Sequence, residues 1–270
     1  MPNHISNIVK ITGEATRVAQ VLETIKGIDP NHVIDFNTFS PMPTELIGTT
    51  SPVTAVSDAE YLKAVLDLDT KKANGTAHGW ETLPITFKMQ SDLIEKYGFD
   101  NWYDWSIANW GTKWNAYESN AIADDTIIFQ TAWSTPYDAM VTMSVVFDDV
   151  TIHVSYADED FGSNVGEYTL VNGLVVSQNT PKSQSKEAIG LALDILGGED
   201  CYLGDDFNDQ DANQELDKYW NIMVELAYER GYHPSEDDEY PISFIERFKE
   251  LAMADENYEL MAELEKIKNN

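Results

Sequence analysis

The sequence predicts an α+β fold, and two observations support this prediction. Apolar and polar residues alternate in several segments of the first 180 residues, as half-buried strands require, whereas other segments repeat their apolar residues at helical spacing. The segment 102–114, WYDWSIANWGTKW, also holds four of the seven tryptophans. Because tryptophan buries a large area, such a cluster is expected to organise a core or to line a binding face.

Short alternating segments predict the strands. They are rich in β-branched and aromatic residues, and Gly, Pro or Asn turns follow most of them. The segment 33–39 is followed by Pro41 and Pro43, which cannot donate to a further ladder. The expected strands are residues 4–13, 33–39, 126–133 and 150–157, with a hairpin over 166–177 that turns at Asn172–Gly173.

Helices are predicted where apolar residues recur every three or four positions. Ser57 is a candidate cap, and Gly111 is expected to end the helix that the tryptophan segment begins. Residues 44–100 look like a helical insertion. The expected helices are 14–26, 58–68, 86–97, the start of 102–114, 185–196, 213–228, 242–253 and 256–268.

Local rules conflict over residues 137–147. The valines and the threonine of this segment favour a strand, whereas Met140, Met143 and Phe147 are spaced three and four apart and favour a helix.

The sequence of the C-terminal region is helical in its periodicity and rich in acidic residues. We therefore predict one domain over residues 1–180 and an acidic helical region over 181–270.

The net charge of −30 limits the partners of this chain. Half of it lies in residues 181–270, where 23 Asp and Glu face 8 Lys and Arg. This field repels phosphates and anionic lipids, so we expect no direct binding of nucleic acid or of a membrane. Three interpretations stay open: an acidic surface for solubility, a mimic of a polyanion that fills a basic groove on another protein, and adaptation to salt.

Cysteine usage and hydropathy indicate the compartment. Cys201 stands alone, so it cannot form an intramolecular disulfide or a thiolate metal cluster, which suits a reducing cytoplasm. The N-terminal segment lacks the basic start and the apolar run of a signal peptide, and no stretch reaches the roughly 18 apolar residues of a membrane span. We expect a cytoplasmic protein.

Five separated motifs resemble one known family. They are MPNHISN at the start, DFNTFSPMP at 35–43, YDWSIANWGTKWNAY at 103–117, FQTAWSTP at 129–136 and YADEDFGSNVGEY at 156–168. Over residues 1–175 the chain is similar to the YubB-type ferredoxin-like family of phages, prophages and conjugative plasmids. The resemblance implies a ferredoxin-like sandwich, an antiparallel sheet with helices on one face, without an iron–sulfur cluster. It also implies that residues 137–147 are helical.

A pocket near the tryptophan segment is one candidate site. Its indoles can stack on a base or on an aromatic ligand while a lysine pairs a phosphate, although the same indoles also suit a core helix. The candidate pocket residues are Trp102, Asp104, Trp110, Lys113, Asp158 and Asp160.

The sequence contains no complete motif for a metal site or a catalytic site. Asp158, Glu159 and Asp160 follow a strand, but the closing glutamate of a calcium loop is missing, and the loop 205–215 lacks the required glycine. None of the five histidines stands in a recognised relation to a nucleophile, and phosphate-loop, dinucleotide and zinc motifs are absent from the sequence. We predict no catalytic residue, metal or cofactor.

The sequence therefore favours a non-enzymatic interaction protein of a mobile genetic element. We expect it to bind a host protein with a basic surface, such as a defence or nucleic-acid-binding protein. The alternatives are a nucleotide- or small-molecule-binding protein or enzyme with the pocket above, and a structural subunit; the oligomeric state stays open. The candidate interaction residues are Asp205, Asp206, Asp209, Asp211, Glu236, Asp237, Asp238 and Glu239.

Overall fold

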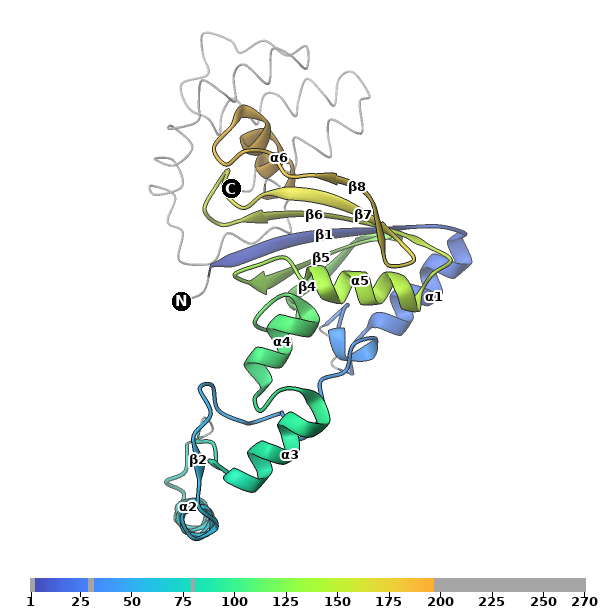
Figure 1. Cartoon of the computed structure of the whole chain (residues 1–270). Helices are drawn as coiled ribbons and strands as arrows, with labels where there is room; N and C mark the ends of the chain where they lie inside the picture. Colours follow the sequence, from blue (N-terminus) through green and yellow to red (C-terminus); the bar gives the residue numbers. More distant parts are fainter. Residues whose placement is uncertain (1–2, 29–31, 79–80, 197–270) are drawn as a thin grey trace, which may run out of the picture.

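The computed structural model describes residues 3–28, 32–78 and 81–196 (Figure 1). The helices expected after residue 196 lie outside the described residues. So do all eight candidate interaction residues, from Asp205 to Glu239. Among the helices described, none has both the length and the apolar character needed to cross a membrane.

A six-stranded antiparallel sheet forms the body of the molecule. Its strand order is β4-β5-β1-β6-β7-β8, so the first strand lies at the centre between β5 and β6. A hairpin extends the sheet beyond β6 through β7 and β8. The strands are β1 (His4–Thr12), β4 (Tyr117–Ala123), β5 (Thr126–Ala132), β6 (Thr151–Asp158), β7 (Gly166–Val171) and β8 (Leu174–Asn179).

The helices follow the periodicity of the sequence closely. Glu14 caps α1 by accepting from the amides of Thr16 and Arg17, and Gly98 ends α3 in the left-handed conformation. The helices are α1 (Ala15–Ile25), α2 (Asp58–Ala73), α3 (Phe87–Tyr97), α4 (Trp102–Trp110), α5 (Tyr137–Val146) and α6 (Lys186–Leu196).

The main core lies between one face of the sheet and helices α1 and α5. Alternate residues of the central strand, Val9 and Ile11, point into it and are fully buried. Helix α5 contributes Met140 and Met143, both fully buried, which explains why residues 137–147 are helical despite their valines. Tertiary burial of one face decides between the two local preferences.

Helix α6 covers the opposite face of the sheet. Its residues Ile189 and Leu193 lie in a second apolar cluster with Ala157 of β6 and with Phe161 and Val165 of the following loop. Figure 1 shows α6 on the far side of the sheet from α5. Helix α6 therefore covers the part of this second face that β1 and β6 form.

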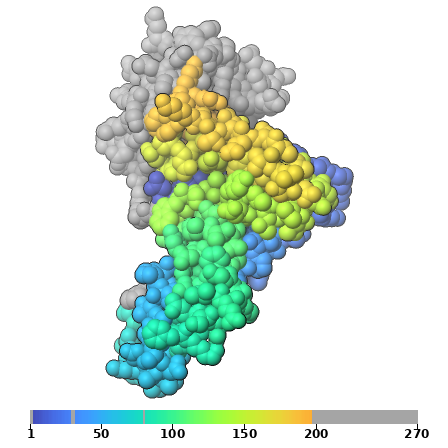
Figure 2. All heavy atoms as spheres, in the orientation of Figure 1, coloured from blue at the N-terminus to red at the C-terminus, as the bar shows by residue number. Residues whose placement is uncertain are grey.

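Residues 44–100 form an arm that projects from the sheet body (Figures 1 and 2). It contains α2, α3 and a two-stranded parallel sheet of β2 (Ala55–Val56) and β3 (Ile85–Thr86). Ser57 and Glu60 form a capping box at the start of α2, as the sequence predicts for Ser57. No residue of α2 is buried, so this helix contributes little to the core.

The strand predicted at 33–39 is wrong. Residues Phe36–Thr38 form a 3-10 helix, η1, which Asp35 caps by accepting from the amide of Asn37. Asn115 Oδ1 accepts the Phe36 amide at 2.9 Å, so a side chain replaces a ladder partner. The edge strand beside β5 is β4, which the sequence analysis missed because two register shifts interrupt its pattern.

Candidate binding surface

Helix α4 divides the tryptophan segment between the core and the surface. Asn101 caps its start by accepting from the amide of Asp104, and Gly111 ends it with a φ of 77°. Trp105 and Trp110 are buried. The Trp110 Nε1–H donates to the carbonyl of Ser40 at 2.9 Å, so this indole is satisfied internally.

Other aromatic side chains form two sets of ring contacts at or near the surface. Neighbouring ring centroids lie 5.7 Å apart for His4 and Tyr117, 6.3 Å for Tyr117 and Trp114, 6.3 Å for Trp133 and Tyr103, and 5.7 Å for Tyr103 and Trp102. Trp114 is 38% exposed and Trp133 is 44% exposed. We call these residues the aromatic row: His4, Tyr117, Trp114, Trp133, Tyr103 and Trp102.

Lys113 joins the two halves of the aromatic row. Its Nζ lies 4.5 Å from the ring centroid of Trp114 and 4.5 Å from that of Trp133. Both distances fall within the range of a cation–π interaction, for which tryptophan is the best ring. We call the space between these two indoles, which Lys113 occupies, the cation slot.

Two hydrogen-bonded loops hold the cation slot. Thr112 Oγ1 donates to the carbonyl of Ala132 at 2.9 Å, and Ser134 Oγ donates to the carbonyl of Gly111. The Trp133 amide donates to the carbonyl of Asn3 at 2.9 Å. These bonds fix the loop before β4 against the loop after β5.

Trp133 has a φ of 72°, in the left-handed region. A bulky residue is an outlier there, and such strain persists only where the surroundings enforce it. The ring gains only partial burial at this position, which distinguishes Trp133 from a core tryptophan. Strained, exposed residues of this kind cluster at functional sites.

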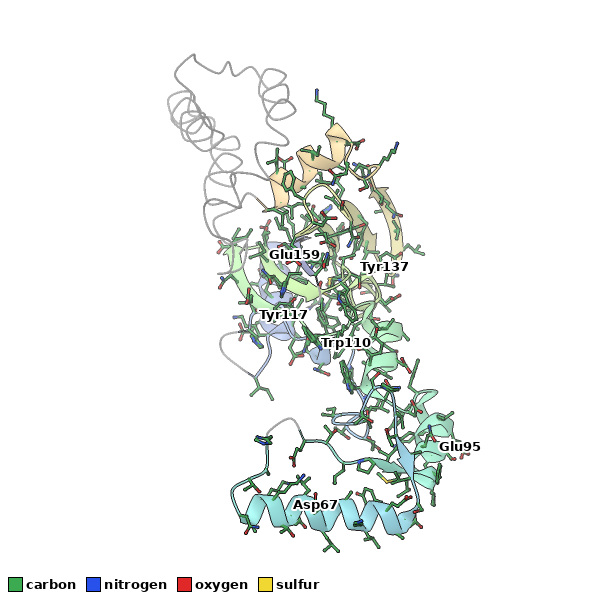
Figure 3. The ribbon with its side chains drawn as sticks, turned by 90° about the vertical axis from the view of Figure 1, so that its left-hand side faces the viewer. Asp67, Glu95, Trp110, Tyr117, Tyr137 and Glu159 are labelled. Carbon is green, nitrogen blue, oxygen red and sulfur yellow. The ribbon has the colours of Figure 1, made fainter. Side chains whose placement is uncertain are left out.

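Two glutamates, Glu118 and Glu159, lie near one end of the aromatic row. Tyr117 OH lies 2.7 Å from His4 Nδ1, and Figure 3 shows Glu159 and Tyr117 on the same side of the body. Burial raises the pKa of the Tyr117 hydroxyl, and the charges of Glu118 and Glu159 raise it further. Two carboxylates therefore act on this end of the row.

A pocket of about 410 Å³ lies beside the aromatic row, at the junction of arm and body. Trp102, Trp110, Lys113 and Trp114 line it together with residues of the arm, among them Ile47. The amide of Trp102 donates to Thr49 Oγ1 at 3.0 Å, so a hydrogen bond joins α4 to the base of the arm.

The structure brings together three of the six pocket residues predicted from the sequence, namely Trp102, Trp110 and Lys113. Asp104 lies on the exposed side of α4, where its carboxylate accepts from Asn101 Nδ2 at 2.8 Å. Asp158 is the last residue of β6 and Asp160 lies in the turn that follows, and neither lines the pocket.

The carboxylate of Asp158 organises that turn. It is buried, and it accepts from Asn3 Nδ2 at 3.0 Å, from the Asp160 amide at 2.9 Å and from Asn164 Nδ2 at 3.1 Å. Its oxygens are thus engaged within the protein. In the described residues, no group of three His, Cys, Asp or Glu side chains is placed to hold a metal ion.

A larger cavity of about 740 Å³ lies between α1 and the β4–β5 hairpin. Its walls include the apolar side chains of Val18, Leu22 and Ile127. Charged residues, among them Glu23 and Asp125, also line it. None of the six predicted pocket residues does so.

Comparison with known proteins agrees with the topology. Residues 109–197 match a family model described as a ferredoxin-like domain in Api92-like protein. The body is a ferredoxin-like domain. Its succession β1-α1-β4-β5-α5-β6 is the β-α-β-β-α-β order of that fold. The fold that the family resemblance implied is confirmed, whereas the mobile-element setting stays a prediction.

One solved structure has a weak similarity to this chain. The protein api92 from Yersinia pseudotuberculosis shares 13% identity, and the similarity covers 68% of this chain and 100% of that chain with a TM-score of 0.36. No curated protein matches this chain. The matched range of the ferredoxin-like domain includes Lys113, Trp114 and Trp133, so the cation slot lies within it.

Sequence reasoning missed Trp133 and Tyr117 as surface residues. Trp133 stands in the segment AWSTP, where it reads as the end of a strand. Its partners Lys113 and Trp114 lie about 20 residues earlier, so the slot forms only when the β4–β5 hairpin closes. The one signal available was an aromatic residue beside a Ser-Thr-Pro turn.

Proposed function

We propose that this chain is a non-enzymatic interaction protein that binds a protein partner with a basic surface. The observation that carries the proposal is the aromatic row, which already holds a cation at its centre, on a chain of net charge −30. Tryptophan and tyrosine are enriched among the residues that dominate binding energy in protein interfaces. Exposed indoles in a negative field suit lysine- and arginine-rich surfaces.

Electrostatics and aromatic contacts have separate roles in this proposal. The negative field of the whole protein accelerates the encounter with a positive surface and is screened by salt. The indoles then supply contact area and cation–π attraction, which act at short range. Binding is therefore expected to weaken as salt rises, without being abolished.

The proposal includes polyanion mimicry by the C-terminal region. The acidic clusters at 205–211 and 236–239 are charged in a way that suits a groove built for nucleic acid. The resemblance to phage and plasmid proteins suggests a partner in the cytoplasm of a bacterial host, in a defence or nucleic-acid-binding system. A DNA duplex would then compete with this protein for its partner.

The test is affinity capture from the bacterial host with the full chain as bait. The matched variant carries Asn or Gln at Asp205, Asp206, Asp209, Asp211, Glu236, Asp237, Asp238 and Glu239. We expect a partner retained by the parent chain at low salt, released by added DNA duplex and lost with the variant. Equal retention by parent and variant, with no competition by DNA, would falsify mimicry.

A second candidate function is the binding of a nucleotide or other small molecule, with or without catalysis. The pocket of about 410 Å³ favours it, because indoles and a lysine line the same space. A thermal-shift screen with nucleotides and divalent metals tests this candidate, since a specific ligand raises the melting temperature by mass action. An unchanged melting temperature at millimolar nucleotide counts against it.

A further inference from the structure

We propose that the cation slot is a receptor for an arginine side chain of the partner, and that Lys113 is its resident, displaceable cation. This inference rests on the proposed function and deepens it, because it names the chemical group that the surface recognises. The argument comes from three features of the slot: how Lys113 is held, how the indoles are held, and which charges surround them.

Lys113 is held by rings and not by a carboxylate. Among the described residues, the ion pairs within 4.0 Å join other lysines and Arg17 to acids, and none of them includes Lys113. Its side chain is only half-buried. A half-buried lysine held by cation–π contacts can leave for solvent without stranding a carboxylate, because an exposed contact of this kind is weak.

The two indoles are held independently of Lys113. Side-chain hydrogen bonds from Thr112 and Ser134 tie the two loops together, and the amide of Trp133 bonds to the Asn3 carbonyl. Both indoles lie 4.5 Å from the Nζ of Lys113, measured to the ring centroids. The slot therefore persists when its cation exchanges, which lowers the ordering penalty for an incoming side chain.

The chemistry of the slot favours a guanidinium group. A guanidinium is planar, stacks on aromatic faces and is more weakly hydrated than an ammonium, so it suits a space between two indoles better than lysine does. Glu118 and Glu159 lie near Tyr117, close enough to raise its pKa, and they add attraction for a cation at that end of the row. An arginine can thus replace Lys113.

The test measures binding of a defined peptide to the full chain by isothermal titration calorimetry. The probe is acetyl-Gly-Arg-Gly-Arg-Gly-amide, and its control carries citrulline, which is neutral and of the same shape, in place of arginine. We expect the arginine peptide to bind and the citrulline peptide to bind more weakly by about tenfold or more, since both cation–π contacts are lost.

Two variants are expected to change the affinity for the arginine peptide in opposite directions. Lys113→Met replaces the resident cation with a neutral side chain and is expected to tighten binding of the arginine peptide by about threefold to thirtyfold. Trp133→Gly removes one ring at a position whose φ glycine adopts freely, so the protein stays folded while the peptide binds more weakly.

Lys96→Met is the matched control for Lys113→Met. Lys96 also lies over a ring, that of Tyr97 at 4.7 Å, and its removal changes the net charge equally. The tightening must therefore be larger for Lys113→Met than for Lys96→Met. Equal effects of the two variants, or equal binding of arginine and citrulline peptides, would overturn the inference.

The two proposals fail in different ways. If the slot does not bind arginine, the arginine and citrulline peptides bind equally. The charge-neutral tail variant can still lose the partner that the parent chain retains. If the chain has no basic partner, the affinity capture fails although the slot discriminates arginine from citrulline in purified protein. The calorimetry therefore tests whether the slot binds arginine, and the affinity capture tests whether the chain binds a basic protein partner.

Discussion

Two pairs of tryptophans close together in the structure have opposite surroundings. Trp105 and Trp110 lie in the core, with ring centroids 5.3 Å apart and with Trp110 bonded to a carbonyl. Trp114 and Trp133 stand at the surface and enclose a lysine instead. The comparison teaches that a dense tryptophan segment can supply both buried rings of a core and, in Trp114, an exposed ring.

The largest expected difference between the pairs is in stability. Trp110→Ala removes a buried ring and its hydrogen bond, so the free energy of unfolding should fall by about 3–5 kcal/mol. Trp114→Ala removes a partly exposed ring and should lower it by about 1–2 kcal/mol. Urea unfolding followed by circular dichroism measures both. Similar losses for the two variants would remove the distinction between core and surface pairs.

The backbone conformation of Trp133 predicts a smaller difference in stability, between the glycine and the alanine variant at this position. Because φ is 72°, Trp133→Gly should be more stable than Trp133→Ala by about 1 kcal/mol. At Trp114, which is not among the positive-φ residues, the order should reverse, with alanine the more stable. Thermal unfolding of the four variants tests this. Alanine being preferred at both positions would show that Trp133 is unstrained.

The smallest effect concerns the second lysine that lies over a ring. Lys96 bonds to Glu45 at 2.8 Å, and this bond is the largest cause that lowers the pKa of Glu45 to about 2 from its usual 4.5. A depressed carboxylate pKa contributes stability that is present above pH 4.5 and is lost as the pH falls to about 2.

Glu45→Gln should therefore melt slightly below the parent at pH 6 and at the same temperature at pH 2. Melting curves across this range measure the difference. A constant gap between parent and Glu45→Gln at every pH would mean that the ion pair contributes no stability.

Much of the fold follows from local sequence signals. The capping pair Ser57 and Glu60, the stop at Gly111 and the turn at Asn172–Gly173 all occur where their chemistry predicts. These features depend on residues within a few positions of one another. Gly111 and the turn at Asn172–Gly173 lie within residues 109–197, the range that matches the ferredoxin-like family model.

The failures have a common physical cause, which is dependence on distant residues. The segment 33–39 alternates like a strand, yet Asn115 takes the Phe36 amide and holds a 3-10 helix instead. Strand β4 lacks a regular pattern because register shifts displace its pairs. The cation slot likewise requires Trp133 and Lys113 to meet through a hairpin, which periodicity does not reveal.

The β4–β5 hairpin that joins the two loops of the slot offers a route for measurement. Its turn at Asp124 and Asp125 lies at the opposite end of β5 from Trp133, and seven residues of β5 separate them. At about 3.3 Å per residue the separation is roughly 20 Å. A surface linker inserted at this turn therefore attaches the molecule at the end of β5 that lies away from the slot.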